Sequence, residues 1–413
     1  MRKFQFQPSW VTLILVIQSL AVLVIFQSMV SFRFVRQAKA VCTGGAPIIF
    51  NFGDSNSDTG GIMAGMGYPI PLPEGRLHFG RSTGRLCDGR LIIDFLCESL
   101  NTHYLSPYLE ALGSNFSNGA NFAICGSRTL PRMQAFALYI QTLQFLHFRS
   151  RSLYLATQGH TGLLGEQDFR NALYMIDIGQ NDMDGAFTEA NGNFQHVLSR
   201  IPPVIEEIKT AIKTLYDNGA RKFWVHNTSP MGCFPQKLAI PRNDDTDLDE
   251  HGCLKTYNNG AKAFNSHLSA VIDSLSLELK DATIVYVDIY SIKYELVANH
   301  SKYGFDNRYM ACCGHGGPPY NYNHSITCMG AGFQVCDDGS KHISWDGVHY
   351  SEAANRVIAS KILTTEYSRP RINYEFFCKA SSPALIVSAS FKCNLRCASP
   401  RERTIVLQSV NLK

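Results

Sequence analysis

The stretch IIFNFGDSNSDTG, residues 48–60, decides the fold and places the first candidate functional residue. Residues 48–52 are almost entirely apolar and β-favouring, which predicts a buried strand. The strand ends at Gly53, so Asp54 and Ser55 follow at its carboxyl end. In open α/β sheets ligands bind at this end, because the strand-to-helix loops leave a crevice there. Ser55 is therefore a candidate nucleophile, provided that a base and an orienting acid reach it from elsewhere in the chain.

The segment SWDGVH, residues 344–349, offers both partners near the other end of the chain. Asp346 and His349 are three residues apart, which on a helical turn places them within reach of each other. The carboxylate would accept a hydrogen bond from Nδ1 and leave Nε2 free to take the proton of Ser55. An Asp-x-x-His pair alone is more often a capping pair or half of a metal site. Its co-occurrence with a strand-end serine favours a serine esterase.

Four further apolar segments predict strands, and amphipathic helices are predicted between them. The strand candidates are residues 120–125, 172–178, 222–226 and 283–289, and the helix candidates are residues 90–96, 203–216, 264–279 and 352–363. Nearly continuous apolar strands that alternate with helices predict an α/β fold with a parallel sheet covered on both faces. The Gly- and Pro-rich stretch over residues 60–89 is long for a connector and predicts a pocket-lining loop.

Two more strand ends carry groups that could stabilise an oxyanion. Gly126 follows the second apolar segment, and Asn181 follows the third. Acyl transfer needs hydrogen-bond donors for the developing oxyanion, and the candidates are the backbone N–H groups of Ser55 and Gly126 and the side-chain amide of Asn181. Taken alone, Gly126 is typical of a turn and Asn181 of a turn or helix cap. We interpret the neighbouring Asp182 as structural.

The first forty residues have the layout of a secretory signal peptide. Arg2 and Lys3 precede an apolar stretch over residues 10–26, and Ala38-Lys39-Ala40 supplies a small-residue cleavage site. A retained signal anchor is the alternative, because roughly 17–25 apolar residues can span a bilayer. Either way the rest of the chain faces the secretory lumen. No stable membrane partner is expected unless this segment is retained.

Composition agrees with a secreted globular protein. The net charge of +4 over 413 residues is too small and too evenly spread to favour nucleic acid. Thirteen cysteines favour an oxidising compartment, and their odd number leaves at least one thiol free or paired between chains. Candidate N-glycosylation sites are Asn115, Asn227, Asn299 and Asn323.

Cysteine spacing predicts two disulfides. Cys233 and Cys253 flank an acidic loop and are expected to pair, and Cys313 is expected to pair with Cys328, with Cys312 as its competitor. Three cysteines in or beside apolar segments are expected to be buried free thiols: Cys87, Cys97 and Cys125. No spacing makes a zinc ribbon, and no H-E-x-x-H, Walker A or G-x-G-x-x-G motif occurs, so neither metal nor cofactor is expected.

Four ordered blocks resemble the plant GDSL esterase/lipase family of the SGNH hydrolase superfamily. The matching blocks are residues 52–60, 119–123, 179–182 and 345–349. Residues 84–90 are a further match, and residues 312–323 resemble the branch with early-nodulin-type and alpha-fucosidase-like members. The resemblance extends over residues 47–363 and implies a three-layer α/β/α, flavodoxin-like domain with a parallel sheet of about five strands (the SGNH hydrolase fold). It implies a metal-free carboxylic ester hydrolase with Ser55, Asp346 and His349 as triad and Ser55, Gly126 and Asn181 as oxyanion hole.

The expected organisation is a signal peptide over residues 1–40, a hydrolase domain over residues 41–369 and an atypical tail over residues 370–413, a candidate disordered segment without a defensible helix or strand. The segment between Gly126 and Leu173 is shorter than the resemblance implies. The expected function is hydrolysis of a small-molecule or glycan ester outside the cell, in the cell wall or apoplast. The alternatives are a glycosidase acting on fucosyl groups and a catalytically silent glycoprotein used for binding or defence.

Overall fold

The computed structural model describes Cys42 and residues 45–378. The predicted signal peptide and residues 379–413 of the predicted tail lie outside the described residues. A six-stranded sheet with the order β2-β1-β3-β4-β5-β8 forms the centre of the fold. Its five parallel strands are β1 (Ile49–Gly53), β2 (Gly119–Asn121), β3 (Leu173–Asp177), β4 (Lys222–His226) and β5 (Thr283–Val287). All five strand predictions are confirmed, and the short β8 (Ser368–Arg369) adds an antiparallel edge.

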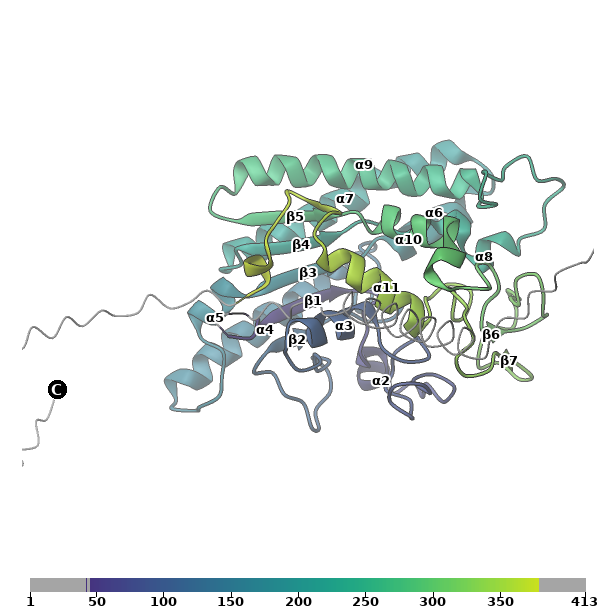
Figure 1. The fold of residues 1–413 in the computed structure, drawn as a ribbon. Helices are drawn as coiled ribbons and strands as arrows, with labels where there is room; N and C mark the ends of the chain where they lie inside the picture. The colour runs from purple at the N-terminus through teal and green to yellow at the C-terminus, as the bar shows by residue number, and fades with distance from the viewer. Residues whose placement is uncertain (1–41, 43–44, 379–413) are drawn as a thin grey trace, which may run out of the picture. The chain divides into compact units, whose positions relative to one another are not determined.

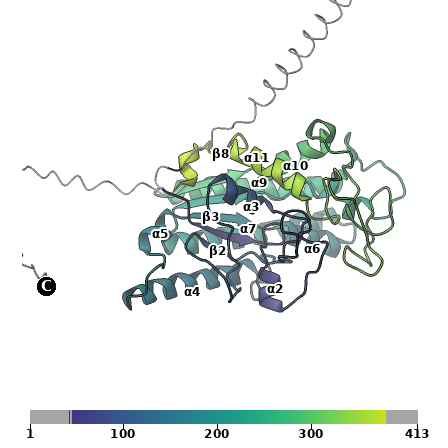
Figure 2. The same cartoon turned by 60° about the horizontal axis from the view of Figure 1, so that its bottom comes forward.

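Helices cover both faces of the sheet, which makes three layers (Figures 1 and 2). One layer contains α3 (Ile92–Ser99) and α11 (Glu352–Leu363), which contact each other. The opposite layer contains α4 (Leu138–Thr157), α7 (Phe194–Asp217) and α9 (Lys255–Glu278), with α7 packed between the other two. The remaining α-helices are α2 (Gly61–Met66), α5 (Glu166–Asn171), α6 (Gln180–Ala190), α8 (Pro235–Leu238) and α10 (Ile289–Ala298). The predicted α/β/α architecture is therefore confirmed.

Helix α4 was not predicted, although it packs on the central strand. Its aromatic side chains Phe145 and Phe148 lie with ring centroids 5.0 and 5.9 Å from that of Phe50 in β1. Apolar residues such as Leu143 and Tyr154 also occupy its exposed side, so no single apolar stripe marks the helix in the sequence.

Helix α7 begins nine residues before the predicted start at Pro203. Asn193 caps the helix by accepting a hydrogen bond from the backbone N–H of Gln195, at 3.1 Å. Val197 and Ile201 are buried and extend the apolar stripe toward the N-terminus. The two prolines lie inside the helix instead of starting it, so the earlier prediction of the helix start was wrong.

The packed chain extends past the domain boundary that we placed at residue 369. Residues Tyr374–Phe377 form a 3₁₀ turn, and the Phe377 ring packs 4.7 Å from that of Trp224 between centroids. A disulfide joins Cys378 to Cys42, 336 residues earlier in the sequence. The boundary at 369 is corrected to at least 378, because a buried aromatic and a long-range disulfide hold this segment.

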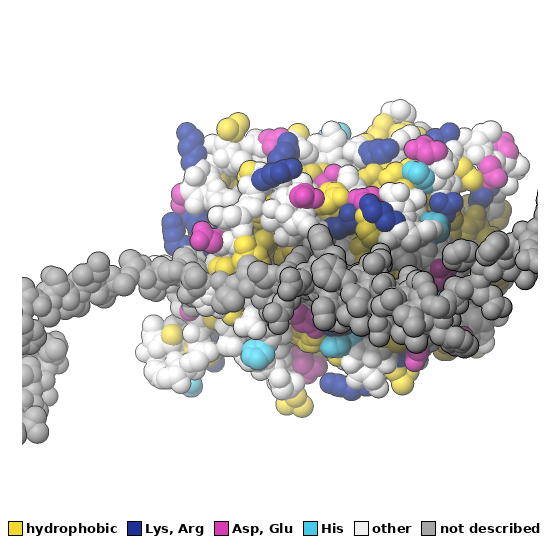
Figure 3. Space-filling view, viewed as in Figure 1, with side chains coloured by type: hydrophobic (Ala, Val, Ile, Leu, Met, Phe, Trp, Pro, Cys, Tyr) yellow, Lys and Arg dark blue, Asp and Glu magenta, His cyan; other side chains and the backbone are white. Residues whose placement is uncertain are grey.

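Charged side chains of both signs are interspersed on the face of the described residues that Figure 3 shows. Within the described residues, none of the helices combines the length and the apolar character needed to cross a bilayer.

The end of β1 is held by a side chain of α4. Gln141 accepts a hydrogen bond from the Gly53 N–H at 2.9 Å and donates one to the Gly53 carbonyl at 2.8 Å. Gln141 and Gly53 are both buried. The amide group thus acts as a substitute strand neighbour at the point where the chain turns toward Ser55.

We expect Gln141→Leu to lower the free energy of unfolding by about 1–3 kcal/mol, because it leaves the buried Gly53 N–H unpaired, whereas the Gly53 carbonyl still accepts the Ile124 N–H at 3.2 Å. Urea denaturation measures the change. Gln144→Leu is the matched control on the same helix, because the buried Oε1 of Gln144 has no hydrogen-bond partner among the described residues. Equal stability of the two variants would contradict this role of Gln141.

Candidate active site

Ser55 lies in a tight turn at the carboxyl end of β1. The Ser57 N–H donates to the Asp54 carbonyl at 3.2 Å, and the Asn56 N–H donates to the Asp54 side chain at 2.9 Å. The turn directs the Ser55 hydroxyl toward a loop from the far end of the chain. There, His349 Nε2 lies 2.8 Å from Ser55 Oγ. Ser55 is 5% exposed and is therefore almost completely shielded from solvent.

The second hydrogen bond of the histidine goes to Asp346. His349 Nδ1 lies 2.5 Å from Asp346 Oδ2, while Asp346 Oδ1 accepts the backbone N–H groups of Val348 and His349 at 2.9 and 2.7 Å. Gly347 has φ +98°, a conformation that favours glycine, and its N–H donates to the Ser344 hydroxyl. The structure thus brings together Ser55, His349 and Asp346 in one chain of hydrogen bonds, in the order that the sequence predicted.

The pKa shifts of His349 and Asp346 are those expected for a base and the acid that orients it. Burial alone would lower the pKa of His349, but the charge and hydrogen bond of Asp346 outweigh it and raise that pKa above its ordinary value of 6.5. Burial alone would raise the pKa of Asp346, but the charge of His349 and three hydrogen bonds lower it. Near neutral pH, Asp346 is therefore ionised and stabilises a proton on His349.

The oxyanion candidates lie on neighbouring loops. Gly126 has φ +78° and sits in a turn closed by the hydrogen bond from the Ser127 N–H to the Ile124 carbonyl. Asn181 lies in the first turn of α6, and its side-chain amide donates to the Ser127 carbonyl at 3.0 Å and lies 3.4 Å from Asp54 Oδ2. The Asn181 amide therefore contacts the loops that carry Ser55 and Gly126.

Two buried carboxylates shape these loops. Asp58 accepts the backbone N–H groups of Gly60, Gly61 and Ile62 in its own loop and that of Cys125 in the loop after β2. Asp182 accepts from the backbone and hydroxyl of Thr129 and from the Leu130 N–H. Asp182 is a structural residue, as the sequence indicated. Two aspartates flank the nucleophile, and the second of them, Asp58, ties its loop to the loop after β2.

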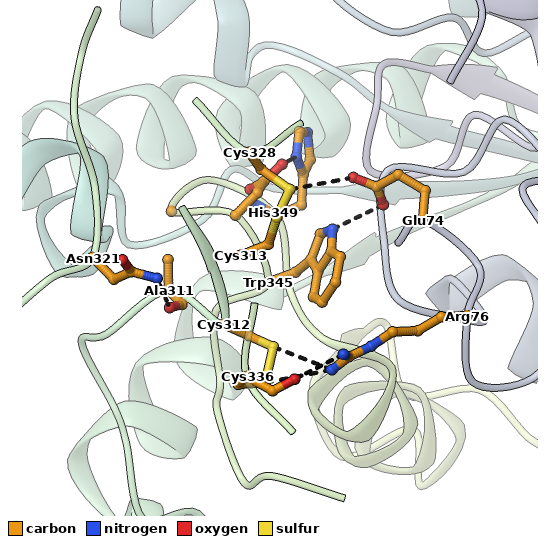
Figure 4. The surroundings of a disulfide bond; sticks show 12 residues. Glu74, Arg76, Ala311, Cys312, Cys313, Asn321, Cys328, Cys336, Trp345 and His349 are labelled. Atoms are coloured by element: carbon orange, nitrogen blue, oxygen red, sulfur yellow. Dashed lines mark hydrogen bonds and ion pairs between the residues drawn. A yellow bond between two sulfur atoms is a disulfide. The ribbon is translucent and has the colours of Figure 1, made fainter. Parts of the chain in front are cut away.

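Glu74 is a buried residue beside the site that the sequence analysis missed. Its carboxylate accepts a hydrogen bond from the indole N–H of Trp345 at 2.8 Å (Figure 4). Trp345 directly precedes Asp346 in the chain. Burial and the nearby charge of Asp346 raise the pKa of Glu74 well above its ordinary value. Glu74 lies in the Gly- and Pro-rich loop, which lines a cavity of about 400 Å³ with residues 104–114. Nothing in the spacing of that loop singles out one glutamate.

Disulfides brace the loop that carries Asp346. Cys313 pairs with Cys328 and Cys312 pairs with Cys336, and the backbone N–H groups of Cys312 and Cys313 donate to the carbonyls of residues 344 and 345. Arg76 donates to the Cys336 carbonyl at 2.7 Å (Figure 4).

The two predicted pairings, Cys233–Cys253 and Cys313–Cys328, are both present. The competitor Cys312 has its own partner, and the Cys42–Cys378 bond was not predicted. The three cysteines expected to be free carry free thiols, with Cys125 only partly buried: Cys87, Cys97 and Cys125.

Three of the four glycosylation candidates are exposed: Asn115, Asn299 and Asn323. Asn227 is 2% exposed, and its amide donates to Tyr286 and Asp288 and accepts the Tyr290 N–H. A bulky glycan needs a surface position, so the assignment of Asn227 is corrected from a glycan site to a structural hydrogen-bonding residue.

A parallel α/β/α fold with these strand-end loops is the architecture of an SGNH-type hydrolase. The profile of the GDSL-like Lipase/Acylhydrolase family matches residues 49–362. The chain is 59% identical over 336 residues to GDSL esterase/lipase At1g09390 of Arabidopsis thaliana, across 80% of this chain and 90% of the relative. GDSL esterase/lipase LIP-4 of the same plant is 56% identical over 344 residues, across 82% and 91%. Alpha-L-fucosidase 3, also of that plant, is 44% identical over 336 residues, across 76% and 90%. The chain belongs to the GDSL lipase/acylhydrolase family and is a carboxylic ester hydrolase.

Proposed function

We propose that the protein is a secreted serine esterase that forms an acyl-enzyme on Ser55. The observation that carries the proposal is the hydrogen-bond chain from Ser55 Oγ to His349 Nε2, 2.8 Å long, and from His349 Nδ1 to Asp346, 2.5 Å long. Such a chain activates a hydroxyl whose own pKa makes it a weak nucleophile.

Each step of the reaction has a group in place. Ser55 Oγ attacks the ester carbonyl while His349 Nε2 takes its proton, and Asp346 stabilises the imidazolium that forms. Collapse of the tetrahedral intermediate breaks the carbonyl–alkoxy bond, and the alcohol leaves with the proton from His349. A water molecule then gives a proton to His349 and attacks the acyl-enzyme, and Ser55 regains its hydrogen as the acid departs.

The oxyanion of each tetrahedral intermediate would accept hydrogen bonds from the backbone N–H groups of Ser55 and Gly126 and from the Asn181 amide. In the described residues neither backbone N–H donates to another group, so both are available. The Asn181 amide donates to the Ser127 carbonyl at 3.0 Å and to Asp54 Oδ2 at the longer distance of 3.4 Å, and the oxyanion would replace the longer of these two contacts.

The expected substrate is a small-molecule or glycan ester that meets the enzyme outside the cell. Four disulfides within the described residues favour an oxidising compartment. The signal peptide proposed for residues 1–40 would deliver the chain there. Neither nucleic acid nor a cofactor has a part in this proposal.

Glycosidase activity on fucosyl groups is the second candidate, because one relative carries the name Alpha-L-fucosidase 3. A retaining or inverting glycosidase uses two carboxyl groups across the scissile bond. Here Asp346 is engaged by His349 Nδ1, and Nε2 of that histidine contacts a serine hydroxyl instead of a second carboxyl group. The geometry therefore favours ester hydrolysis.

We expect Ser55→Ala to reduce kcat/KM on nitrophenyl acetate and butyrate by about 10³–10⁶-fold, because triad members act as a unit. Assays with the two esters and a nitrophenyl fucoside, with circular dichroism of both proteins, measure the change. Ester turnover that survives in a folded Ser55→Ala protein would overturn the assignment. Fucoside turnover lost with Ser55→Ala would support the second candidate.

We expect Asn181→Ala to lower kcat by roughly 10²–10³-fold with little change in KM, because the lost donor acts mainly in the transition state. Asn181→Asp is the companion variant, since its carboxylate cannot donate and should be at least as damaging. The melting temperature separates this effect from unfolding. Normal kcat in Asn181→Ala would return Asn181 to a purely structural role.

The rate should depend on the protonation of His349. Because Asp346 raises the pKa of His349 above 6.5, kcat/KM should rise with pH and reach half of its plateau above pH 6.5. Initial rates from pH 5 to 9, corrected for the Ser55→Ala background, give the midpoint. A midpoint well below 6.5, or a flat profile, would exclude His349 with this environment as the base.

A further inference from the structure

A buried ammonium group lies against the residue that follows His349 and has no part in the mechanism above. Lys293 of α10 is 2% exposed. Its Nζ donates to the Ser229 hydroxyl at 2.9 Å and lies 4.4 Å from the centroid of the Tyr350 ring. No carboxylate among the described residues lies within ion-pairing distance of it. A buried charge with one neutral hydrogen-bond partner costs several kcal/mol unless nearby charges compensate it.

Two carboxylates provide that compensation at longer range. Asp177 is the last residue of β3, and Asp54 directly follows Gly53, the last residue of β1. Gly53 and Asp177 are paired in the register of these two parallel strands. Burial lowers the pKa of Lys293 to about 8, and the charges of Asp177 and Asp54 oppose this effect, so the ammonium form predominates at neutral pH. The two carboxylates also repel each other: burial and the charge of Asp177 raise the pKa of Asp54 to about 7. Burial would raise the pKa of Asp177 too, but the nearby His226 and the charge of Lys293 lower it.

The same ammonium group touches the histidine loop. The ring that covers Lys293 belongs to Tyr350, the residue directly after His349. Asp54, whose charge acts on Lys293 at longer range, directly precedes Ser55 in the chain. Lys293 therefore contacts the residue that follows the base and interacts with the residue that precedes the nucleophile, and it contacts neither reacting atom.

We propose that Lys293 is a positioning residue of the esterase reaction, whose ammonium group balances the charges of Asp54 and Asp177 and so keeps His349 available as a neutral base. The inference rests on the proposed function. A second part of its role is geometric, because the cation–π contact holds Tyr350 and thereby the adjacent histidine.

The groups that act on His349 come from three directions. Asp346 lies on its own loop, Asp54 on the loop after β1 and Lys293 on α10. Asp54 favours the imidazolium and Lys293 opposes it. Beyond this shell, Glu74 faces Asp346, and His226 of β4 faces Asp177 with its Nδ1 3.9 Å from the carboxylate.

The signs of two substitutions follow from this arrangement. Lys293→Met keeps the length of the side chain but removes its charge, so the remaining carboxylates favour the imidazolium and the pKa of His349 rises. Asp54→Asn removes the opposing charge, so that pKa falls. The double variant removes one charge of each sign and should return close to the wild-type value.

The experiment is an NMR titration of the His349 ring in protein labelled at histidine, with the signal assigned by its loss in His349→Gln. We expect Lys293→Met to move the midpoint up by about one pH unit, the size that a unit charge on the order of 10 Å away produces at an effective dielectric constant of about 25. The pH profile of kcat/KM should shift in the same direction. Because Asp54 titrates nearby, both midpoints describe the coupled cluster.

Lys222→Met is the matched control. Lys222 is partly buried, begins β4 at the amino end of the parallel strands, away from the candidate site, and donates to the Cys378 carbonyl. The His349 midpoint should stay within about 0.2 pH units in this variant. The same small change in Lys293→Met, or shifts of equal sign in Lys293→Met and Asp54→Asn, would overturn the proposal.

The proposal can be tested even if Lys293→Met does not fold. If Lys293→Met fails to fold, Asp54→Asn is compared with the double variant, in which one carboxylate is removed together with the ammonium group. The double variant should then titrate at higher pH than Asp54→Asn alone, and equal midpoints would refute the role of Lys293. Failure of the proposed esterase function is separate, because it appears as ester turnover in Ser55→Ala and leaves the ring titration unaffected.

Discussion

The parallel register of β1 between β2 and β3 is the constraint on which the site depends. Parallel strands end on one edge, so the loops that carry Ser55, Gly126 and Asn181 are neighbours although they are up to 126 residues apart in sequence. Buried aromatic packing of α4 on β1 and the paired hydrogen bonds of Gln141 hold the strand end itself. A shift of one residue would turn the nucleophile away from its base.

The base arrives by a different route and needs its own supports. His349 and Asp346 lie on a loop outside the parallel sheet, so no strand register fixes them. Two disulfides attach to that loop through the hydrogen bonds of Cys312 and Cys313, and Glu74 holds the indole of Trp345. The helix α11 starts three residues after His349 with Ser351 as its N-cap. The site is thus a rigid strand edge facing a braced loop.

Local patterns explain what the sequence could predict. Apolar strands that end at Gly53 or Gly179, and an Asp-x-x-His turn, are short-range signals, and they locate Ser55, Asn181 and His349 correctly in space. Burial is a property of the whole fold, and no local pattern carries it. For this reason Asn227 looked like a glycan site although β5 covers it, and α4 was missed because its apolar residues surround the helix.

Lys293 and Glu74 are the strongest examples of information that sequence spacing lacks. A lysine at the fifth position of a helix and a glutamate in a loop are ordinary surface residues by composition, and most are exposed. Here each is fully buried next to charges from other elements, which destabilises the folded state relative to apolar side chains of the same volume. Burying several charged side chains around Ser55 and His349 therefore lowers the stability of the fold. Such burial is expected where charge must be balanced during a reaction. The electric field at His349 is then set by a fixed arrangement of neighbouring side chains and not by mobile solvent.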